Sequence, residues 1–185
     1  MRKLQRSEIV DYQTYGESRD AFRQEVMAHK APRRVHVGEF LTFLFETRQT
    51  VRYQVQEMMR AERIVRENDI QHELDTYNEL LGGDGELGCT LLIEIDDQAR
   101  RDQLLRSWID LPRHLYVETE GGSRVRPERD ERQVGTDRLS SVQYLKFPVQ
   151  GAVPVGIGVD HPELSAHAAL SAEQKAALIA DLGDS

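Results

Sequence analysis

The sequence predicts a single α+β domain, in which a mainly antiparallel sheet is covered by helices. An apolar, strand-like segment over residues 35–46 runs directly into an amphipathic, helix-like segment over residues 50–67. Helical and strand patterns then follow one another without the regular alternation that builds parallel sheets. The length of 185 residues is usual for one domain, so we expect residues 1–185 to form one domain.

The segment before the core is expected to form helices within residues 7–30. Ser7 is a suitable N-cap for the first, and Glu8 follows it near the positive end of the helix dipole. The second helix is predicted over Ser18–Lys30 and ends before Pro32, which cannot continue a helix.

The core of the domain is expected over residues 35–160. In VHVGEFLTFLF, residues 35–45, both alternating registers are apolar near the end, which is typical of a central strand covered on both faces. Further helices are predicted over 51–67, 69–81 and 97–109, and strands over 90–95, 116–120, 123–126, 142–149 and 153–159. A helical tail is expected over residues 162–185, with its helix over Ser171–Leu182.

Charge is unevenly distributed along the chain. The net charge is −8, yet residues 1–66 hold 13 of the 24 basic side chains and 9 of the 32 acidic ones. The acidic remainder argues against a general nucleic-acid binder, because binding to phosphates depends on an excess of Lys and Arg. The basic first third keeps local nucleic-acid binding open as an alternative.

Cys89 is the one cysteine of the sequence, which excludes an intramolecular disulfide and a cysteine-rich metal site. Free cysteines are among the most buried residues, so we expect an inert thiol at the beginning of a strand. No apolar run follows the basic N-terminal residues, and none is long enough to span a membrane. We therefore expect a cytoplasmic protein with no secretory signal.

One charged residue interrupts the apolar face of the predicted helix 51–67. On a helical wheel Glu62 falls close to the centre of that face, which is formed by Val51, Val55, Met58 and Val65. A buried carboxylate is costly unless it is paired, so Glu62 must contact a cation or metal, be neutral, or face an opening. The alternatives are a structural ion pair with Arg34 or Arg48, a ligand-binding or active-site role, and a solvated position.

Polar residues gather around the junction between the predicted strand and helix. Carboxylates and imidazole are common metal ligands, so a mononuclear site for a divalent metal is one candidate. Its candidate ligands are Glu62, Glu46, Glu57 and His161. Supporting polar candidates are Arg34, Arg48, Gln54, Arg60 and Tyr144. A solvated helix face is the alternative for most of these side chains.

No established catalytic signature is present. The sequence lacks HExxH, GxSxG and a Walker motif. Gly156 and Gly158, which lie just before and at the start of GVDHP (residues 158–162), complete no phosphate loop. Lys30, Arg33 and Arg34 form a basic cluster that is more typical of a charged turn than of a phosphate site. The sequence therefore predicts no cofactor-binding residues.

One long stretch is distinctive: LTFLFETRQTVRYQVQEMMRAERI, residues 41–64. Together with ELDTYNELL, TLLIEI, SSVQYLKF and GVDHP, it resembles the signature of the bacterial family known as domain of unknown function 3501. The resemblance covers most of the chain, and it implies no established activity or catalytic residue. It does imply an association with rubrerythrin-like and iron–sulfur oxidoreductase proteins, and thus with redox or peroxide metabolism.

Three hypotheses for function follow, in this order. The first is an accessory or binding protein without enzymatic activity, acting with a protein partner in a redox system. The second is a small metal- or ligand-dependent enzyme with a carboxylate and histidine site. The third is nucleic-acid binding through the basic N-terminal patch.

Overall fold

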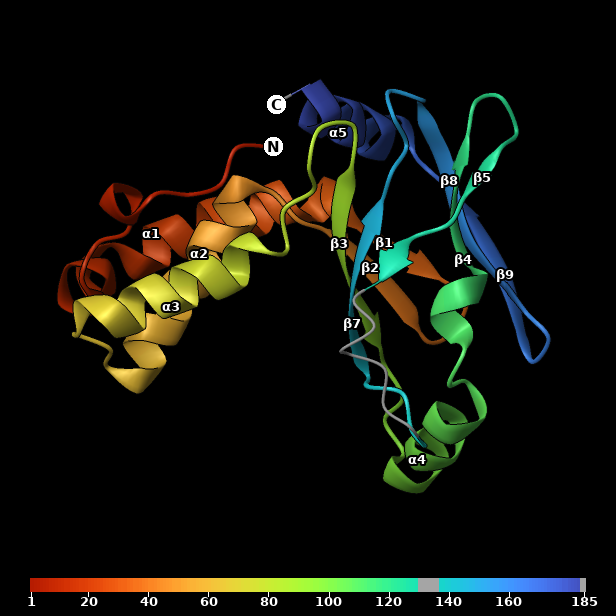
Figure 1. Ribbon diagram of the computed structural model, residues 1–185, viewed down its shortest axis with the longest axis horizontal. Helices are drawn as coiled ribbons and strands as arrows, with labels where there is room; N and C mark the ends of the chain where they lie inside the picture. Colours follow the sequence, from red (N-terminus) through yellow and green to blue (C-terminus); the bar gives the residue numbers. More distant parts are fainter. Residues whose placement is uncertain (130–136, 184–185) are drawn as a thin grey trace.

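The computed structural model describes residues 1–129 and 137–183, which form two antiparallel sheets with helices around them (Figure 1). The helices are α1 Tyr12–Lys30, α2 Arg48–Glu62, α3 Glu67–Asn78, α4 Gln98–Ser107 and α5 Ala172–Gly183, with 3-10 helices over Arg6–Glu8, Ala31–Arg33 and Leu111–His114. The strands are β1 Arg34–Val37, β2 Leu41–Phe45, β3 Leu87–Ile93, β4 Leu115–Thr119, β5 Arg124–Val125, β6 Glu128–Arg129, β7 Val142–Phe147, β8 Pro154–His161 and β9 Leu164–Ala169. The predicted α+β class is confirmed.

The two sheets enclose the main hydrophobic core. Sheet A has the order β1-β2-β3-β7-β6 and sheet B the order β5-β4-β8-β9, and every neighbouring pair is antiparallel. Alternate residues point into the core between the sheets, as the fully buried Phe43, Leu91 and Ile157 do. The residues between them lie on the opposite face of sheet A, which we call its outer face.

The apolar segment predicted as one strand over 35–46 is a hairpin formed by β1 and β2. Gly38 begins its turn with a φ of +64°, a backbone conformation that favours glycine. The chain reverses there, and Val37 pairs with Leu41 in antiparallel register. The sequence pattern missed this turn because one glycine inside an apolar run is a weak turn signal.

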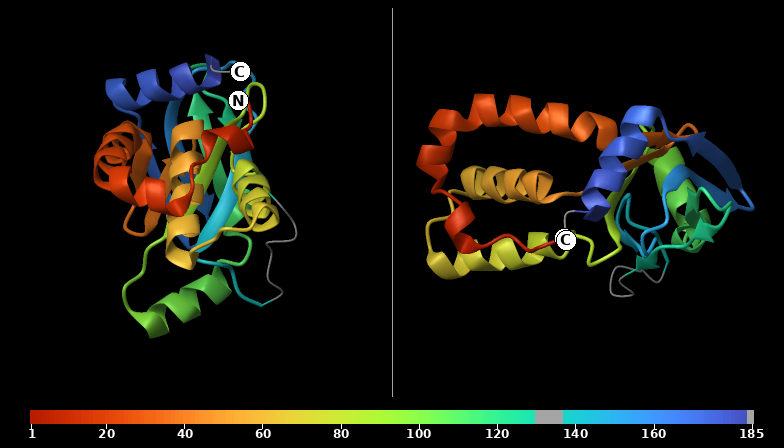
Figure 2. Two further views of the ribbon diagram at one scale, coloured as in Figure 1. Left: turned by 90° about the vertical axis from the view of Figure 1, so that its left-hand side faces the viewer. Right: turned by 90° about the horizontal axis from the view of Figure 1, so that it is seen from above.

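Helices α1, α2 and α3 lie side by side and extend away from the sheets as one layer (Figure 2). This helical layer has its own hydrophobic core, separate from the core between the sheets. The buried residues of this second core come from the N-terminal segment, α2, α3 and the segment after α3; they are Leu4, Ile9, Val51, Val55, Met59, Ile70, Leu74, Leu80 and Leu81.

Caps set the boundaries of these helices and correct the predicted ones. The Asp11 side chain accepts hydrogen bonds from two backbone amides of the first turn, so α1 is one continuous helix that begins well before Ser18. Thr47 caps α2 in the same way. Helix α2 ends at Glu62, because Arg63 adopts the left-handed conformation with a φ of +52°.

Two buried side-chain amides hold the N-terminal segment against the helical layer. Asn78 accepts a hydrogen bond from the backbone N–H of Leu4 (2.8 Å) and donates one to its carbonyl (3.0 Å). Gln56 makes the same pair of bonds with Val10, at 2.8 and 3.0 Å. Each amide thus imitates the pairing of a neighbouring strand.

The C-terminal segment begins with a strand, which corrects the predicted helical tail over 162–185. Strand β9 pairs with β8, and α5 follows it. The strand sequence, Leu-Ser-Ala-His-Ala-Ala, has no β-branched or aromatic residue and therefore gives little strand signal. A nearly buried ion pair of 2.8 Å between Arg33 and Asp181 ties α5 to the end of α1.

The thiol of Cys89 points into the core between the sheets, which confirms the predicted buried cysteine. Burial raises the pKa of this thiol well above its ordinary value. Among the described residues, no helix combines the length and the apolar character needed to cross a bilayer.

Candidate functional site

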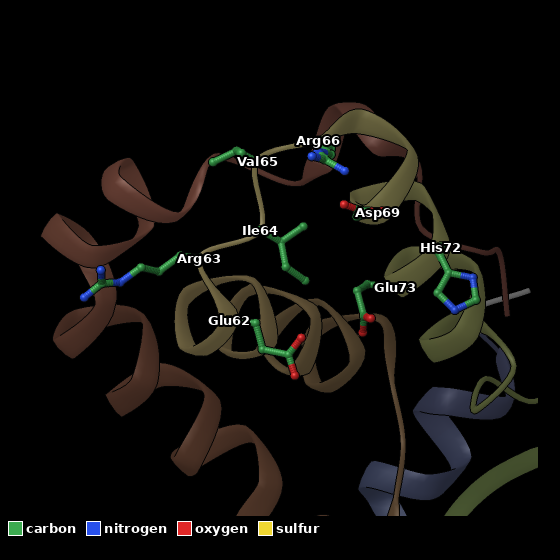
Figure 3. Close-up of a pocket in the computed structure, with 8 residues that line it drawn as sticks. All are labelled: Glu62, Arg63, Ile64, Val65, Arg66, Asp69, His72 and Glu73. Carbon is green, nitrogen blue, oxygen red and sulfur yellow. The ribbon is translucent and has the colours of Figure 1, made fainter.

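Glu62, placed by the helical wheel inside the buried stripe, is exposed in the structure. It is the last residue of α2 and lines a hollow of about 440 Å³ between the end of α2 and the start of α3 (Figure 3). Figure 3 shows the carboxylates of Glu62 and Glu73 directed into the same space. The rest of the lining is Arg63, Ile64, Val65, Arg66, Asp69 and His72. Water reaches this carboxylate, so its charge needs no buried partner.

The buried stripe of α2 is rotated relative to the predicted one. Its fully buried members are Val51, Val55 and Met59, whereas Val65 lies beyond the helix and is 67% exposed. Gln56 is 1% exposed because its amide is satisfied by the backbone of Val10. A helical wheel counts glutamine as polar and therefore leaves Gln56 out of the buried stripe. The predicted centre of the stripe was for this reason displaced towards Glu62.

Glu57 forms a clamp between α1 and α2. Its carboxylate accepts hydrogen bonds from the Tyr15 hydroxyl (2.6 Å) and from two nitrogens of Arg19 (2.7 and 2.9 Å). Hydrogen bonding from Arg19 outweighs the effect of burial and holds the pKa of Glu57 below its ordinary value. Arg60 lies 4.0 Å away, at the margin of this group. These contacts give Glu57 and Arg60 a structural role.

A second hollow, of about 510 Å³, lies between the end of α1, the start of α2 and α5. Its arginines are already engaged, because Arg33 pairs with Asp181 and Arg48 pairs with Glu8. Arg48 also donates hydrogen bonds to two backbone carbonyls of the N-terminal segment. Arg48 therefore holds that segment in place and does not pair with Glu62.

His161 is 5% exposed at the end of β8, on sheet B. Its Nδ1 accepts a hydrogen bond from the backbone N–H of Glu163 (3.1 Å), so the ring proton is on Nε2, which donates to Asp110 (3.1 Å). Burial raises the pKa of Asp110, but hydrogen bonds from His161 and His114 outweigh it and keep that pKa below its ordinary value. Both ring nitrogens of His161 are used, so neither is free to bind a metal.

The structure therefore separates the candidate ligands of the predicted mononuclear metal site. These are Glu62, Glu46, Glu57 and His161, and each has its own surroundings. Across residues 1–129 and 137–183, no group of three or more His, Cys, Asp or Glu side chains could hold a metal ion. The described residues therefore do not form the predicted single site that combines these carboxylates with His161.

Glu46, which follows β2 and precedes α2, is the carboxylate that is buried, at 2% exposed. Its Oε1 accepts hydrogen bonds from the Thr90 hydroxyl (2.6 Å) and the Gln54 amide (3.2 Å). Its Oε2 accepts one from the Thr50 hydroxyl. All three donors are neutral, and within the described ranges Glu46 has no ion pair. Its two carboxylate oxygens thus have hydrogen-bond donors but no cation in contact.

Lys30, the last residue of α1, lies in the electrostatic reach of this carboxylate. Its side chain is half-buried, with Nζ 5.2 Å from the centre of the Tyr53 ring. Burial lowers the pKa of the Lys30 ammonium; attraction to Glu46 opposes this shift, and repulsion from Arg34 adds to it. In the part of the chain that the structure describes, this ammonium has no hydrogen bond or ion pair.

Strand register places further predicted residues in one row across sheet A. Arg34 is opposite Leu44, which is opposite Thr90, which is opposite Tyr144, so one row crosses four strands. Because the Thr90 hydroxyl donates to Glu46, this row on the outer face of sheet A passes beside the buried carboxylate. We call the resulting group the outer-face site, and it consists of Lys30, Arg34, Glu46, Tyr53, Gln54, Thr90 and Tyr144.

A histidine lies in the next row of the same face. Nδ1 of His36 is 2.8 Å from the hydroxyl of Thr42, and that hydroxyl donates to Glu94. A hydroxyl has one proton, so the Thr42 hydroxyl must accept from Nδ1–H of the exposed His36. His36 follows Arg34 by two residues, on the same side of β1.

The outer-face site contains four residues that the sequence singled out and several that it did not. The predicted ones are Glu46, Gln54, Arg34 and Tyr144. Lys30 was recognised as part of a basic cluster, without any link to Glu46. Thr90 was missed because its contact with Glu46 depends on pairing between strands 44 residues apart. No local pattern carries that information.

Comparisons with known proteins identify the fold and the family. A crystal structure of a novel protein of unknown function from Burkholderia pseudomallei K96243 is 29% identical, with a TM-score of 0.89. The match covers 98% of this chain and 100% of that one. No curated protein matches the chain. The model of the family described as "Protein of unknown function (DUF3501)" matches residues 3–182, so the chain belongs to the DUF3501 family, as its motifs predicted.

Proposed function

We propose that the protein binds a small anionic molecule at the outer-face site. The observation that supports this is the pair of cations Lys30 and Arg34, which have no ion-pair partner among residues 1–129 and 137–183. Burial lowers the pKa of the Lys30 ammonium; attraction to Glu46 opposes this shift, and repulsion from Arg34 adds a smaller effect in the same direction as burial. A carboxylate or phosphate group between the two would relieve this repulsion and accept charge-assisted hydrogen bonds.

The surroundings of the two cations suit a small ligand. Tyr53 offers an aromatic face beside Lys30, and Tyr144, 41% exposed, offers another surface at the far end of the row. The Glu46 carboxylate beside the row attracts the Lys30 ammonium, so a ligand with several negative charges is disfavoured there. The site favours a molecule with one anionic group and an adjacent uncharged polar group.

Calorimetric titration tests this proposal with phosphate, acetate, lactate and pyruvate at low ionic strength. We expect Arg34→Gln to weaken the best ligand by about tenfold or more, since a hydrogen bond to a charged group contributes roughly 1.5–3 kcal/mol. Arg113→Gln is the matched control, because it removes an exposed arginine beside sheet B. Absence of saturable binding for all four anions, or an equal loss in both variants, would contradict the proposal.

The accessory role in redox or peroxide metabolism stays a prediction about a protein partner. The Cys89 thiol is a poor candidate for the redox group itself, because it is buried and its raised pKa disfavours the thiolate. Titration of the purified chain with a purified rubrerythrin-like protein tests the partnership directly. No binding at micromolar concentrations would remove the reason to place the protein in such a system.

The basic first third of the chain supports nucleic-acid binding less than its charge suggests. Several of its cations are paired with carboxylates; they are Lys3, Arg6, Arg19, Arg33 and Arg48. Paired cations contribute less to phosphate binding, because their counter-charges must be displaced. Retention on DNA or RNA at low salt that declines as salt rises would favour this alternative again.

A further inference from the structure

The loop between α2 and α3 lies at the end of the helical layer that is far from the sheets (Figure 1). Its residue Val65 is 67% exposed, more than any other large apolar side chain in the described part of the chain. The loop backbone is fixed next to α2, because Arg63 is left-handed and the N–H of Ile64 donates to the Met59 carbonyl (3.0 Å). The Ile64 side chain also packs against the core of the helical layer. Val65 is therefore presented to water by an ordered loop, so its burial in a contact would cost little conformational entropy.

Charges of both signs line the hollow of about 440 Å³ beside this loop. The carboxylates are those of Glu62, Asp69 and Glu73, and the guanidinium groups are those of Arg63 and Arg66. Within the described residues, these five side chains form no hydrogen bond or ion pair. In Figure 3 the Arg63 side chain extends away from the carboxylates of Glu62 and Glu73. The hollow thus holds complementary charges that one chain does not bring together. We call this surface, together with the exposed valine of the loop, the α2–α3 tip.

We propose that the α2–α3 tip is the contact surface of a homodimer, in which the loop of each copy docks at the hollow of the other. The observation that favours a second copy over a different protein is that one surface carries both halves of a charge-complementary contact. A twofold axis brings Arg63 and Arg66 of each copy to the carboxylates of the other, and every contact occurs twice. The same arrangement removes both Val65 side chains from water.

The charges and the valine have different roles in this contact. Each ion pair at an exposed surface contributes little affinity, but complementary charges fix the orientation of the two copies and exclude surfaces of the wrong sign. Burial of Val65 supplies the apolar contribution at the centre. The contact is small, so we expect a weak dimer that dissociates on dilution. The dimer is independent of the proposed anion binding, because the α2–α3 tip shares no residue with the outer-face site.

Sedimentation velocity of the full chain, from low micromolar to millimolar concentration, tests whether the dimer exists. At low salt we expect the sedimentation coefficient to rise with concentration from the monomer value to the dimer value. At high salt the same rise should need a higher concentration, because salt screens exposed ion pairs. A protein that stays monomeric at every concentration in low salt overturns the proposal, and so does a dimer that high salt does not weaken.

The apolar centre of the contact is tested with a matched pair of variants. Val65→Ser should weaken the dimer about tenfold or more, since each dimer loses two valines from its interface. Ile179→Ser is the control, because it removes another exposed apolar side chain, 45% exposed on α5, away from the α2–α3 tip. It should leave the dissociation constant unchanged. An equal loss in the two variants, or no loss with Val65→Ser, overturns the placement of the interface.

Exchange of the charges tests the complementarity itself. One half-exchanged variant combines Arg63→Glu with Arg66→Glu, and the other combines Glu62→Arg with Glu73→Arg. In each, surfaces of one sign would face each other, so both should stay monomeric. The fully exchanged variant has all four substitutions, keeps the wild-type net charge and should form the dimer again. Half-exchanged variants that still form dimers, or a fully exchanged variant that stays monomeric although circular dichroism shows it folded, overturn the proposal. Val65→Ser keeps the test valid where an exchanged variant fails to fold.

Discussion

At the scale of single residues, Glu46 shows how a carboxylate can be buried without a cation in contact. Two threonine hydroxyls and one glutamine amide donate to it, so both of its oxygens have hydrogen-bond donors although no cation contacts them. A side chain of the same shape that can also accept these bonds should therefore be tolerated, whereas loss of the side chain should leave buried donors unsatisfied.

We expect Glu46→Ala to lower the free energy of unfolding by about 1–3 kcal/mol and Glu46→Gln by less than about 1 kcal/mol. The glutamine oxygen can still accept from Thr90 and Gln54. Its amide can donate to the Thr50 hydroxyl, which has an alternative acceptor in the Thr47 carbonyl at 3.0 Å. Urea unfolding of both variants measures this. Equal losses would show that the charge, and not the hydrogen-bonding shape, is what the fold requires.

Lys30 should make stability depend on alkaline pH. Its pKa is lower in the folded chain than its ordinary value of 10.5, so between the folded and the unfolded pKa the unfolded chain binds more protons. Stability therefore rises with pH through that window. We expect the wild type to gain stability between neutral pH and about pH 10 relative to Lys30→Met, which lacks the titrating group. Parallel pH profiles of the two proteins would argue against a desolvated ammonium.

At the scale of elements, the Glu57 clamp joins α1 to α2. The lowered pKa of Glu57 means that its contribution is present above the ordinary value of about 4.5 and is lost as pH falls through the folded pKa. We expect Glu57→Gln to cost about 1–2 kcal/mol at pH 7, a range reduced because the carboxylate is partly exposed, and progressively less as the pH falls through the folded pKa. Glu25→Gln on the exposed side of α1 is the control. A cost that persists at low pH would assign the effect to packing.

Sequence patterns predicted the existence of the elements better than their boundaries and contacts. The amphipathic helix after the apolar segment exists, but its rotation was misjudged because a buried polar residue, Gln56, belongs to the buried stripe. The hairpin turn at Gly38 was hidden inside an apolar run. Both errors have one cause: a partner distant in sequence decides whether a residue is buried, and periodicity contains no information about that partner.

Gly156 and Gly158, around the start of the GVDHP stretch, illustrate the same limit. The sequence correctly excluded a phosphate loop, but it could not say why glycine is required there. The Tyr116 side chain lies across β8 where a Cβ at Gly158 would be, and the His167 ring occupies the corresponding place at Gly156. These glycines make room for side chains of neighbouring strands.

At the scale of the whole molecule, the outer-face site lies where the two cores meet. Phe43 of strand β2 belongs to the core between the sheets. Helix α2 begins five residues later along the chain (Figure 1) and belongs to the core of the helical layer. The site takes residues from the ends of elements in both parts. From the sequence, residues of this site could be grouped only where they are close along the chain, as Glu46 and Gln54 are. The other residues are brought together by the register of four strands, which the sequence does not reveal.

The arrangement of the two parts depends on α5, which docks against the end of α1 through Arg33 and Asp181. Both side chains are nearly buried, at 10% and 8% exposed, and two hydrogen bonds of 2.8 Å join them. Removal of one partner from a buried ion pair leaves an unmatched charge. We therefore expect Asp181→Asn to lower the free energy of unfolding by about 3–5 kcal/mol.

Urea unfolding followed by circular dichroism measures this loss, with Asp102→Asn as the matched control. Asp102 pairs with Arg106 and Arg138 on the surface, at 47% exposed, so its loss should cost less than about 1 kcal/mol. Hydrogen exchange of Asp181→Asn should then show faster exchange in α5 and at the end of α1, with the interior of sheet A unchanged. Equal destabilisation by the two variants would mean that α5 is held by apolar contacts, such as those of the fully buried Leu178, and not by this ion pair.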